Sequence, residues 1–357
     1  MGGLKFKVGR IILIDDDSEQ LNFLCEEVKT SLKGIDCNVE PWLPPSGEVL
    51  VAFDKLIDNG ATLVVTDYDL TKGASGFFGT SVVAWCQRLA IPVGDYSRGN
   101  RKNMPTEPSL FEFRFSSTAK LAAPQIAAIY AGFAGILHRL EETPTLLKAL
   151  SPANMLAELL NEPSAVSAFS LYTPQVGTNS NLLELVQTEG SRLPLSAYVL
   201  GHLLFNSILK FPGPIVDAQT TCAYFACNED QFPRLEPILS EAKYDGPFAE
   251  LGSYYWRRKI DDLVDTWAES SAIEYTGHIA SFRRALIEER IGGDPLQRFN
   301  CPRCAGELGG YRCPFTRAVV CERSDCSVGT SGWIPVGADL NRVERVFYDE
   351  TAPMLGS

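Results

Sequence analysis

The chain has 357 residues, 45% of them hydrophobic and 21% charged, which is typical of a globular protein of two or three domains and excludes extensive disorder. The formal net charge of −12 disfavours non-specific binding to nucleic acid, so a nucleic-acid partner is open but not favoured. No apolar run is long enough to cross a membrane and residues 1–10 lack a signal-peptide core, so we expect a cytoplasmic protein that does not bind membranes.

The first predicted strand is an apolar run that ends in acidic residues. The run 11–14 is followed directly by Asp15, Asp16 and Asp17. A short apolar run of this kind fits a buried strand of a parallel sheet. Ser18 can then cap a helix. The apolar face of this helix is predicted to consist of Leu21, Leu24, Val28 and Leu32.

A second predicted strand repeats this arrangement. The stretch VVTDYDL, residues 64–70, places Asp67 directly after β-branched residues. In open α/β sheets the carboxyl ends of the strands form the edge where ligands bind, so Asp67 is expected near Asp15 and Asp16. Crowded carboxylates repel one another unless a cation lies between them, and hard oxygen ligands suit Mg²⁺. Taken alone, Asp67 is equally compatible with a solvated loop.

A third predicted strand, in AIPVGDYS, ends in a hydroxyl residue, Ser97. In order and spacing, LIDDD, VVTDYDL and IPVGDYS resemble the receiver domain of two-component response regulators. This resemblance covers residues 1–142 and implies a doubly wound α/β fold of the receiver or flavodoxin type. It implies that Asp67 accepts a phosphoryl group and that Ser97 contacts it. It also implies that Mg²⁺ is held by Asp15, Asp16, Asp67 and the backbone carbonyl of Asp69.

The sequence departs from the receiver pattern in two places. Receivers usually carry a lysine after the fifth strand, which is predicted in FEFRF, residues 111–115. Ser116 and Ser117 follow here, and the nearest lysine, Lys120, is the candidate for the second phosphoryl contact. The stretch RGNRKNMPTEPS indicates a loop where receivers have a helix. A degenerate receiver that takes no phosphoryl group is therefore an alternative.

The segment 143–296 shows apolar residues at helical spacing and is predicted to be a mostly α-helical domain. Its most unusual part is an aromatic and basic stretch that includes Tyr255, Trp256, Arg257 and Arg258. These residues can form an interface with a protein or nucleic acid, or the core and salt-bridged surface of a helical domain, and we favour the second interpretation. We find no phosphate-binding glycine loop and no nucleophile elbow in this segment.

The segment 297–357 holds half of the ten cysteines. Cys301 and Cys304 form one closely spaced pair, and Cys321 and Cys326 form a second. Two such pairs are typical of a small zinc ribbon, with Cys313 as a spare or substitute ligand. Four thiolates close the coordination shell of Zn²⁺, so a structural role is favoured over catalysis. The scattered thiols of Cys25, Cys37 and Cys86 are simplest to interpret as small buried hydrophobic groups.

The sequence therefore predicts a response-regulator-like signalling protein: a phosphoacceptor rather than a turnover enzyme, with Mg²⁺ and structural Zn²⁺ as cofactors. A sensor kinase or another protein is the expected partner, and the sequence leaves a homodimer open. The alternative is a degenerate receiver in a binding or scaffold protein for a protein or nucleic-acid partner, such as in a DNA-related or defence system. An unrecognised enzyme in segment 143–296 is a third interpretation.

Overall fold

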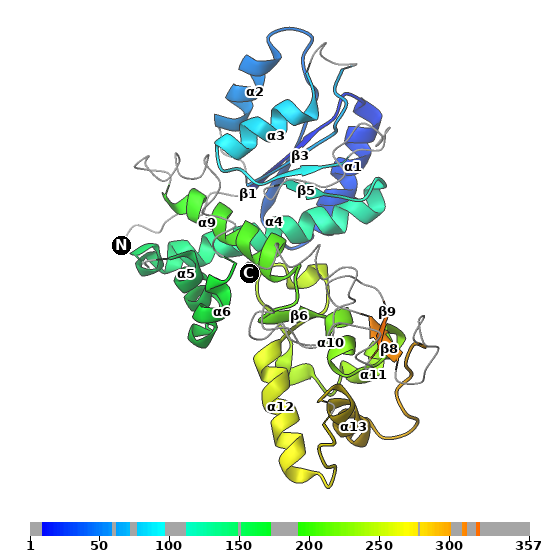
Figure 1. Cartoon of the computed structure of the whole chain (residues 1–357). Coiled ribbons are helices and arrows are strands. Elements are labelled where there is room, and N and C mark those ends of the chain that lie inside the picture. The colour runs from blue at the N-terminus through cyan, green and yellow to red at the C-terminus, as the bar shows by residue number, and fades with distance from the viewer. Residues whose placement is uncertain are drawn as a thin grey trace. The chain divides into compact units, whose positions relative to one another are not determined.

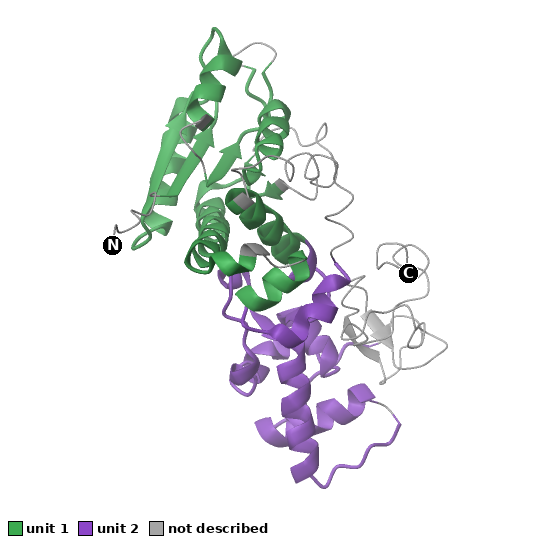
Figure 2. Cartoon of the chain, turned by 90° about the vertical axis from the view of Figure 1, so that its left-hand side faces the viewer, with its two compact units in different colours: residues 1–159, 175–206 green, residues 160–174, 207–357 purple. Residues whose placement is uncertain are grey.

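The structure is a computed structural model. It describes residues 9–58, 62–71, 77–96, 112–148, 151–172, 192–277, 279–300, 309–312 and 319–321. The chain divides into two compact units, shown in Figure 2. Unit 1 comprises residues 1–159 and 175–206, and unit 2 comprises residues 160–174 and 207–357.

Unit 1 is an α/β structure built on a five-stranded sheet in which every neighbouring pair of strands is parallel. The strand order is β2-β1-β3-β4-β5. The predicted apolar runs that end in acidic residues are thus confirmed as adjacent strands, β1 and β3. The strands are β1 (Gly9–Ile14), β2 (Cys37–Trp42), β3 (Leu63–Thr66), β4 (Val93–Asp95) and β5 (Glu112–Arg114).

Helices cover both faces of this sheet (Figure 1). They are α1 (Ser18–Ser31), α2 (Val49–Asp58), α3 (Gly79–Arg88) and α4 (Ala119–Glu142). Helices α2 and α3 bury Phe53 and Val82 against Ile12 and Val64 of the sheet. Helices α1 and α4 contact each other on the opposite side. Because strand side chains alternate between faces, successive apolar residues of β1 can serve both layers.

Helix α1 shows how closely its sequence pattern specifies the local structure. All four residues of its predicted apolar face are at most 4% exposed. Its cap, however, is Asp17, whose side chain accepts hydrogen bonds from the backbone N–H groups of Glu19 and Gln20. Ser18, the cap expected from the sequence, is instead the first residue of the helix. Aspartate and serine cap equally well, so composition alone did not distinguish the two.

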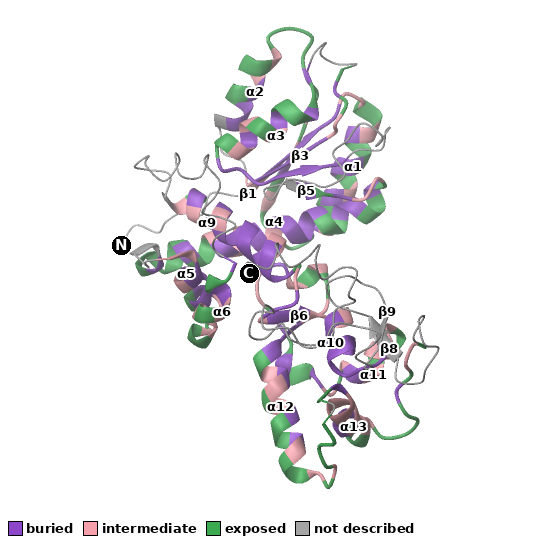
Figure 3. Ribbon diagram, in the orientation of Figure 1, coloured by how far each residue is buried: buried purple, intermediate pink, exposed green. Residues whose placement is uncertain are grey.

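Helix α4 is long and apolar because it is covered on two sides. Among the described helices, it alone has the length and composition to span a membrane, with a mean hydropathy of 1.4. However, 56% of its apolar 18-residue stretch is buried inside the protein. Helix α9 (Arg192–His202) returns from far along the chain and packs on it. There His202 stacks on Phe113 of β5, with ring centroids 4.9 Å apart. Packing within unit 1 therefore accounts for the apolar composition of α4, and Figure 3 shows its buried residues.

Helix α5 (Pro152–Leu159) and α9 both lie in segment 143–296 of the sequence and belong to unit 1 with the sheet. Short 3₁₀ or π turns join the longer elements of both units. These are η2 (Pro144–Lys148), η3 (Pro163–Ala165), η4 (Leu203–Ile208), η5 (Glu229–Gln231), η6 (Ser240–Ala242) and η7 (Ala249–Leu251).

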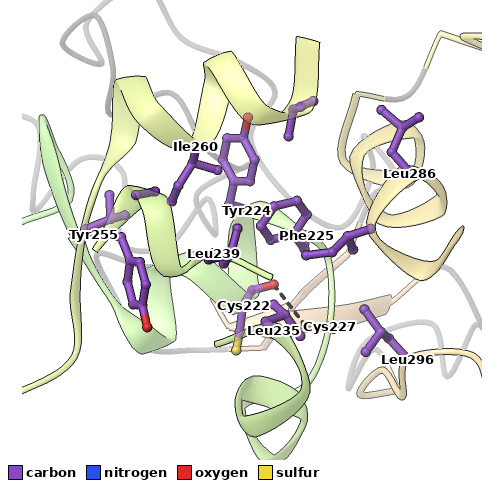
Figure 4. Packing of buried hydrophobic residues seen from close by; sticks show 14 of the residues in the cluster. Cys222, Tyr224, Phe225, Cys227, Leu235, Leu239, Tyr255, Ile260, Leu286 and Leu296 are labelled. Carbon is purple, nitrogen blue, oxygen red and sulfur yellow. Dashed lines mark hydrogen bonds between the residues drawn. The ribbon is translucent and has the colours of Figure 1, made fainter. Parts of the chain in front are cut away.

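Unit 2 combines short helices with two small antiparallel strand pairs, β6 with β7 and β8 with β9. Figure 4 shows its core, where Tyr224, Phe225 and Leu235 pack with Ile260 and Leu286. The helices are α6 (Val166–Ser170), α10 (Ala218–Tyr224), α11 (Phe232–Leu235), α12 (Arg257–Ser270) and α13 (Ile279–Ile291). The strands are β6 (Ile215–Asp217), β7 (Tyr254–Trp256), β8 (Gly309–Arg312) and β9 (Val319–Cys321).

The aromatic and basic stretch lies at the junction of β7 and α12 and is packed inside unit 2. Tyr255 is fully buried, and Trp256 and Arg257 are 6% and 5% exposed. The Nε of Arg257 donates to both carboxylate oxygens of Asp261, at 3.0 and 3.1 Å. Of the four residues considered for an interface, Arg258 is the exposed one. These contacts favour the architectural interpretation of the stretch.

We therefore expect Trp256→Ala to destabilise unit 2 by about 3–5 kcal/mol, because truncating a buried tryptophan removes apolar contacts and leaves a cavity. The measurement is chemical denaturation followed by circular dichroism. Arg258→Ala is the matched control, since exposed substitutions usually change stability by less than about 0.5 kcal/mol. Equal stability of the Trp256→Ala variant and the wild type would contradict an architectural role.

Candidate functional site

Three carboxylates meet at the carboxyl edge of the parallel sheet. Asp15 and Asp16 follow β1, and Asp67 follows β3, the strand that pairs with β1. Each of the three offers a carboxylate oxygen, and these oxygens all lie within 4.8 Å of one another. The structure thus brings together three of the residues that the sequence predicted for a metal site.

The loop after β1 is shaped by its own aspartates. The Oδ1 of Asp15 accepts a hydrogen bond of 2.8 Å from the backbone N–H of Asp17. Asp17 in turn caps α1, so the turn between strand and helix is held at two successive points. Asp15 is only 8% exposed. Donors such as the N–H of Asp17 offset the free-energy cost of placing a charged carboxylate where water has limited access.

The loop after β3 is anchored to β1 at the position of Asp67. The backbone N–H of Asp67 donates to the carbonyl of Ile14 at 2.8 Å, which continues the strand pairing by one residue. The Oδ1 of Asp67 accepts from the N–H of Tyr68 at 2.8 Å. The hydroxyl of Thr66 donates to the carbonyl of Asp67 at 2.9 Å. These bonds fix both the backbone and the carboxylate of Asp67.

Gly79, the first residue of α3, lies directly against this loop. Its N–H donates to the carbonyl of Tyr68 at 2.9 Å. A Cβ at position 79 would lie 2.3 Å from the carbonyl oxygen of Asp67, which is far inside van der Waals contact. The close approach of α3 to the acidic loop therefore requires glycine at this position.

The side chain of Asp69 has a different environment. Its Oδ1 accepts from the N–H of Thr71 at 3.2 Å and from the hydroxyl of Thr71 at 2.5 Å. Its backbone forms an isolated antiparallel bridge with Phe78. Asp69 thus stabilises the loop through its side chain. This leaves the prediction for Asp69 unaffected, because that prediction concerned its backbone carbonyl alone.

The two residues predicted to contact a phosphoryl group are placed differently. Ser97 lies outside the described residues. Lys120 is exposed in the first turn of α4, where it lines an open hollow of about 480 Å³. Phe23 of α1 and the segment 117–119 form the rest of that hollow.

Sequence reasoning missed Asp95, the last residue of β4. It is 5% exposed and pairs in register with Thr66 on β3 and with Arg114 on β5. The signal was present, because VGD repeats the pattern of a buried strand that ends in acid.

The three carboxylates suit a hard divalent cation. Mg²⁺ prefers oxygen ligands and commonly uses one or two carboxylates together with water and phosphate oxygens. A bound cation would also offset the repulsion among three acidic groups. The donor set of Asp15, Asp16 and Asp67 therefore fits Mg²⁺.

The predicted zinc ligands lie in the C-terminal segment of the chain. The side chains of Cys301, Cys304, Cys313, Cys321 and Cys326 all lie outside the described residues. The backbone of β8 and β9 is described, and these strands form an antiparallel pair that ends at Cys321. Among the described thiols, burial raises the pKa values of Cys25 and Cys86. Cys25 and Cys86 are buried, as expected for small hydrophobic groups, whereas Cys37 is only partly buried and does not fit that interpretation.

No protein-family model matches the sequence, and no curated protein matches it. Among solved structures, the chain is similar to the crystal structure of E. coli K-12 YqhD, a protein of unknown function. The identity is 12%, over 82% of this chain and 80% of that chain. The TM-score of 0.18 is too low for this likeness to carry an argument about fold or function.

We expect Gly79→Ala to weaken Mg²⁺ binding by about tenfold or more. Changes to the groups that hold metal ligands in place commonly lower metal affinity by this much. The added methyl group must push the carbonyl of Asp67 away and so move its carboxylate. The measurement is isothermal titration calorimetry. Gly47→Ala is the matched control, since a Cβ at position 47 meets no atom within 4 Å. Equal Mg²⁺ affinities for the two variants would show that Gly79 does not position the site.

Proposed function

We propose that unit 1 is a receiver-like signalling module that binds Mg²⁺ and accepts a phosphoryl group on Asp67. The proposal rests on three carboxylates at one edge of the sheet. Asp15, Asp16 and Asp67 each place a carboxylate oxygen within 4.8 Å of those of the other two. Clustered carboxylates that a cation can neutralise are a suitable place to receive a phosphoryl group, whose transfer depends mainly on positioning and electrostatic stabilisation.

The topology supports a doubly wound fold of the receiver type. From β1 the chain passes to β2 on one side and then to β3 on the other, so the direction of the strand order changes between β1 and β3. Loops that leave two such strands diverge and open a crevice at their carboxyl ends. The aspartates lie on these two loops, where a doubly wound sheet places its ligand.

Asp67 is suited to act as the nucleophile because hydrogen bonds to the loop orient it. A carboxylate oxygen of Asp67 would attack the phosphorus of the donor, forming an oxygen–phosphorus bond. The bond between phosphorus and the donor's leaving group would break, and the leaving group would depart with the bonding electrons. Asp15, Asp16 and Asp67 would hold Mg²⁺, which offsets the negative charge of the phosphoryl oxygens. A sensor kinase or a small acyl phosphate has the chemistry to serve as donor.

Incubation with acetyl phosphate and Mg²⁺ is expected to add the mass of one phosphoryl group to the intact protein, because Asp67 is oriented among cation-binding carboxylates. The measurement is intact mass spectrometry. Asp67→Asn should abolish the addition, because an amide is a poor nucleophile, whereas Asp54→Asn, an exposed aspartate of α2, should not.

The same experiment distinguishes the alternative function. Failure of the wild type to gain a phosphoryl group from acetyl phosphate and from other phosphoryl donors would contradict the phosphoacceptor proposal. It would favour a degenerate receiver that acts as a binding or scaffold module.

We also propose that the C-terminal segment is a zinc ribbon. The support is the antiparallel pair of β8 and β9, which begins after the first cysteine pair and ends at Cys321, the first cysteine of the second pair. A hairpin of this kind can bring two thiolate pairs to one tetrahedral ion. Cys301, Cys304, Cys321 and Cys326 would hold Zn²⁺, with Cys313 as the substitute.

The purified protein is expected to contain about one equivalent of zinc by elemental analysis, because a closed shell of four thiolates binds this ion tightly. Replacing Cys301 and Cys304 by serine should remove the zinc, while replacing Cys25, a buried thiol of α1, should not. A zinc content near zero in protein purified without chelator, or an iron chromophore, would contradict the ribbon.

A further inference from the structure

Two buried cysteines lie at the carboxyl end of α10, in the core of unit 2. Cys222 is in the last turn of α10, and Cys227 follows the end of the helix at Tyr224 by three residues. Each side chain is 1% exposed, and neither cysteine is in a disulfide. The acidic site and the proposed zinc ribbon use neither of them. Figure 4 shows the two cysteines beside each other within the core.

The backbone at the end of α10 forms a Schellman motif that brings these two residues together. The N–H of Cys227 donates to the carbonyl of Cys222 at 3.0 Å, and the N–H of Ala226 donates to the carbonyl of Ala223 at 3.1 Å. Ala226 adopts the left-handed conformation that this motif requires, with φ of 50°. Glycine usually occupies this position, because a Cβ is unfavourable there. The fold thus holds Cys227 against Cys222 although the favoured glycine is absent.

The distance between the two cysteines fits a disulfide. From the N···O distance of 3.0 Å, standard bond lengths place the Cα atoms of Cys222 and Cys227 no more than about 7 Å apart. Disulfides join Cα atoms that are about 4.4–6.8 Å apart. The thiol of Cys227 also donates to the carbonyl of Cys222 at 3.5 Å, so its sulfur lies on the side of the turn that faces Cys222 (Figure 4). An interaction with the Cys227 thiol, together with burial, raises the pKa of Cys222, as expected for neighbouring thiols.

The same turn anchors the start of the C-terminal segment. Asn228, directly after Cys227, donates its backbone N–H to the carbonyl of Gln297 at 2.8 Å. The side chain of Asn228 caps η5 by accepting a hydrogen bond from the N–H of Asp230 at 3.2 Å. A covalent bond between Cys222 and Cys227 would therefore restrain the point at which residues 228 and 297 meet.

We propose that Cys222 and Cys227 are a redox site that forms a reversible disulfide, with a small-molecule disulfide as the oxidant. One cysteine, as its thiolate, attacks a sulfur of the oxidant, whose S–S bond breaks, and one half of the oxidant leaves and takes up the cysteine's proton. The sulfur of the other cysteine then attacks the cysteine sulfur of this mixed disulfide. The bond between Cys222 and Cys227 forms, and the second half of the oxidant leaves as a thiol with the second proton. The two cysteines together lose two electrons, which the oxidant gains.

Burial of the pair affects the rate of this exchange but not its equilibrium. The turn must open locally before a reagent reaches either sulfur, so the exchange is expected to be slow. The final proportions of dithiol and disulfide do not depend on that path. They depend on how closely the chain holds the two sulfurs together. The pair is therefore expected to be oxidised more readily in the folded protein than in the unfolded chain.

The test equilibrates the full chain with mixtures of reduced and oxidised glutathione, once in native buffer and once in urea that unfolds the protein. Samples start from both the reduced and the oxidised chain, so that their agreement marks equilibrium. The remaining thiols are then alkylated in denaturant, and the chain is digested with trypsin for mass spectrometry. The tryptic peptide 211–234 contains Cys222 and Cys227 and no other cysteine. Its disulfide form carries no alkyl group and is lighter than the dithiol by two hydrogen atoms.

The midpoint of oxidation is expressed as the ratio of oxidised glutathione to the square of reduced glutathione. In native buffer this ratio is expected to be at least about tenfold lower than in urea, because the fold holds the reacting groups in place. Dithiothreitol should restore the dithiol. The tryptic peptide 73–88, which contains Cys86 alone, is the internal control. Cys86 is fully buried and should remain a thiol throughout the native samples.

Three results would overturn the inference. Equal midpoints in native buffer and in urea would show that closeness in sequence, and not the fold, accounts for the bond. Alkylation of both cysteines at every glutathione ratio in native buffer would show that the folded pair does not form a disulfide. Cross-linking of peptide 211–234 to another peptide, or a mixed disulfide with glutathione as the final product, would show that the two cysteines do not pair with each other.

Discussion

The candidate site depends on one backbone hydrogen bond, the 2.8 Å bond from the N–H of Asp67 to the carbonyl of Ile14. It extends the pairing of β1 with β3 just beyond the last strand residues, Ile14 and Thr66. Because parallel strands end at the same edge, this bond brings the loop that carries Asp15 and Asp16 beside the loop that carries Asp67. Three carboxylates then lie within reach of one ion.

That arrangement is electrostatically unfavourable on its own, so the surrounding structure must hold it. Backbone N–H groups of Asp17 and Tyr68 donate to the carboxylates of Asp15 and Asp67 and reduce the free energy of holding these charges in partly buried positions. Gly79 allows α3 to pack against the carbonyl of Asp67 with no intervening side chain. The site is thus supported by the chain's own peptide groups, which leaves the carboxylates oriented before a ligand binds.

Local patterns in the sequence predicted much of unit 1. The apolar face of α1 and the acidic ends of β1 and β3 follow from spacing alone, and the meeting of Asp15 with Asp67 follows once the strands are assumed to be parallel neighbours.

Local sequence patterns did not predict contacts between residues that lie far apart in the chain. Nothing local indicates that α9 packs on α4, or that His202 stacks on Phe113 of β5. Asp95 was overlooked because its position level with Thr66 depends on the pairing of β3 with β4, which no local pattern indicates. The end of α3 gave no signal either, since Ala90 adopts the left-handed conformation (φ 53°) that usually marks a glycine.

The central claim is that Asp15, Asp16 and Asp67 bind one divalent cation. The most direct measurement is anomalous X-ray diffraction from crystals of the protein grown with Mn²⁺, which shares the oxygen ligands of Mg²⁺ and can be located by its own scattering. The account predicts an anomalous peak at coordination distance from carboxylate oxygens of all three aspartates. Ordered aspartates at this edge with no peak between them, at a Mn²⁺ concentration that saturates ordinary carboxylate sites, would contradict it.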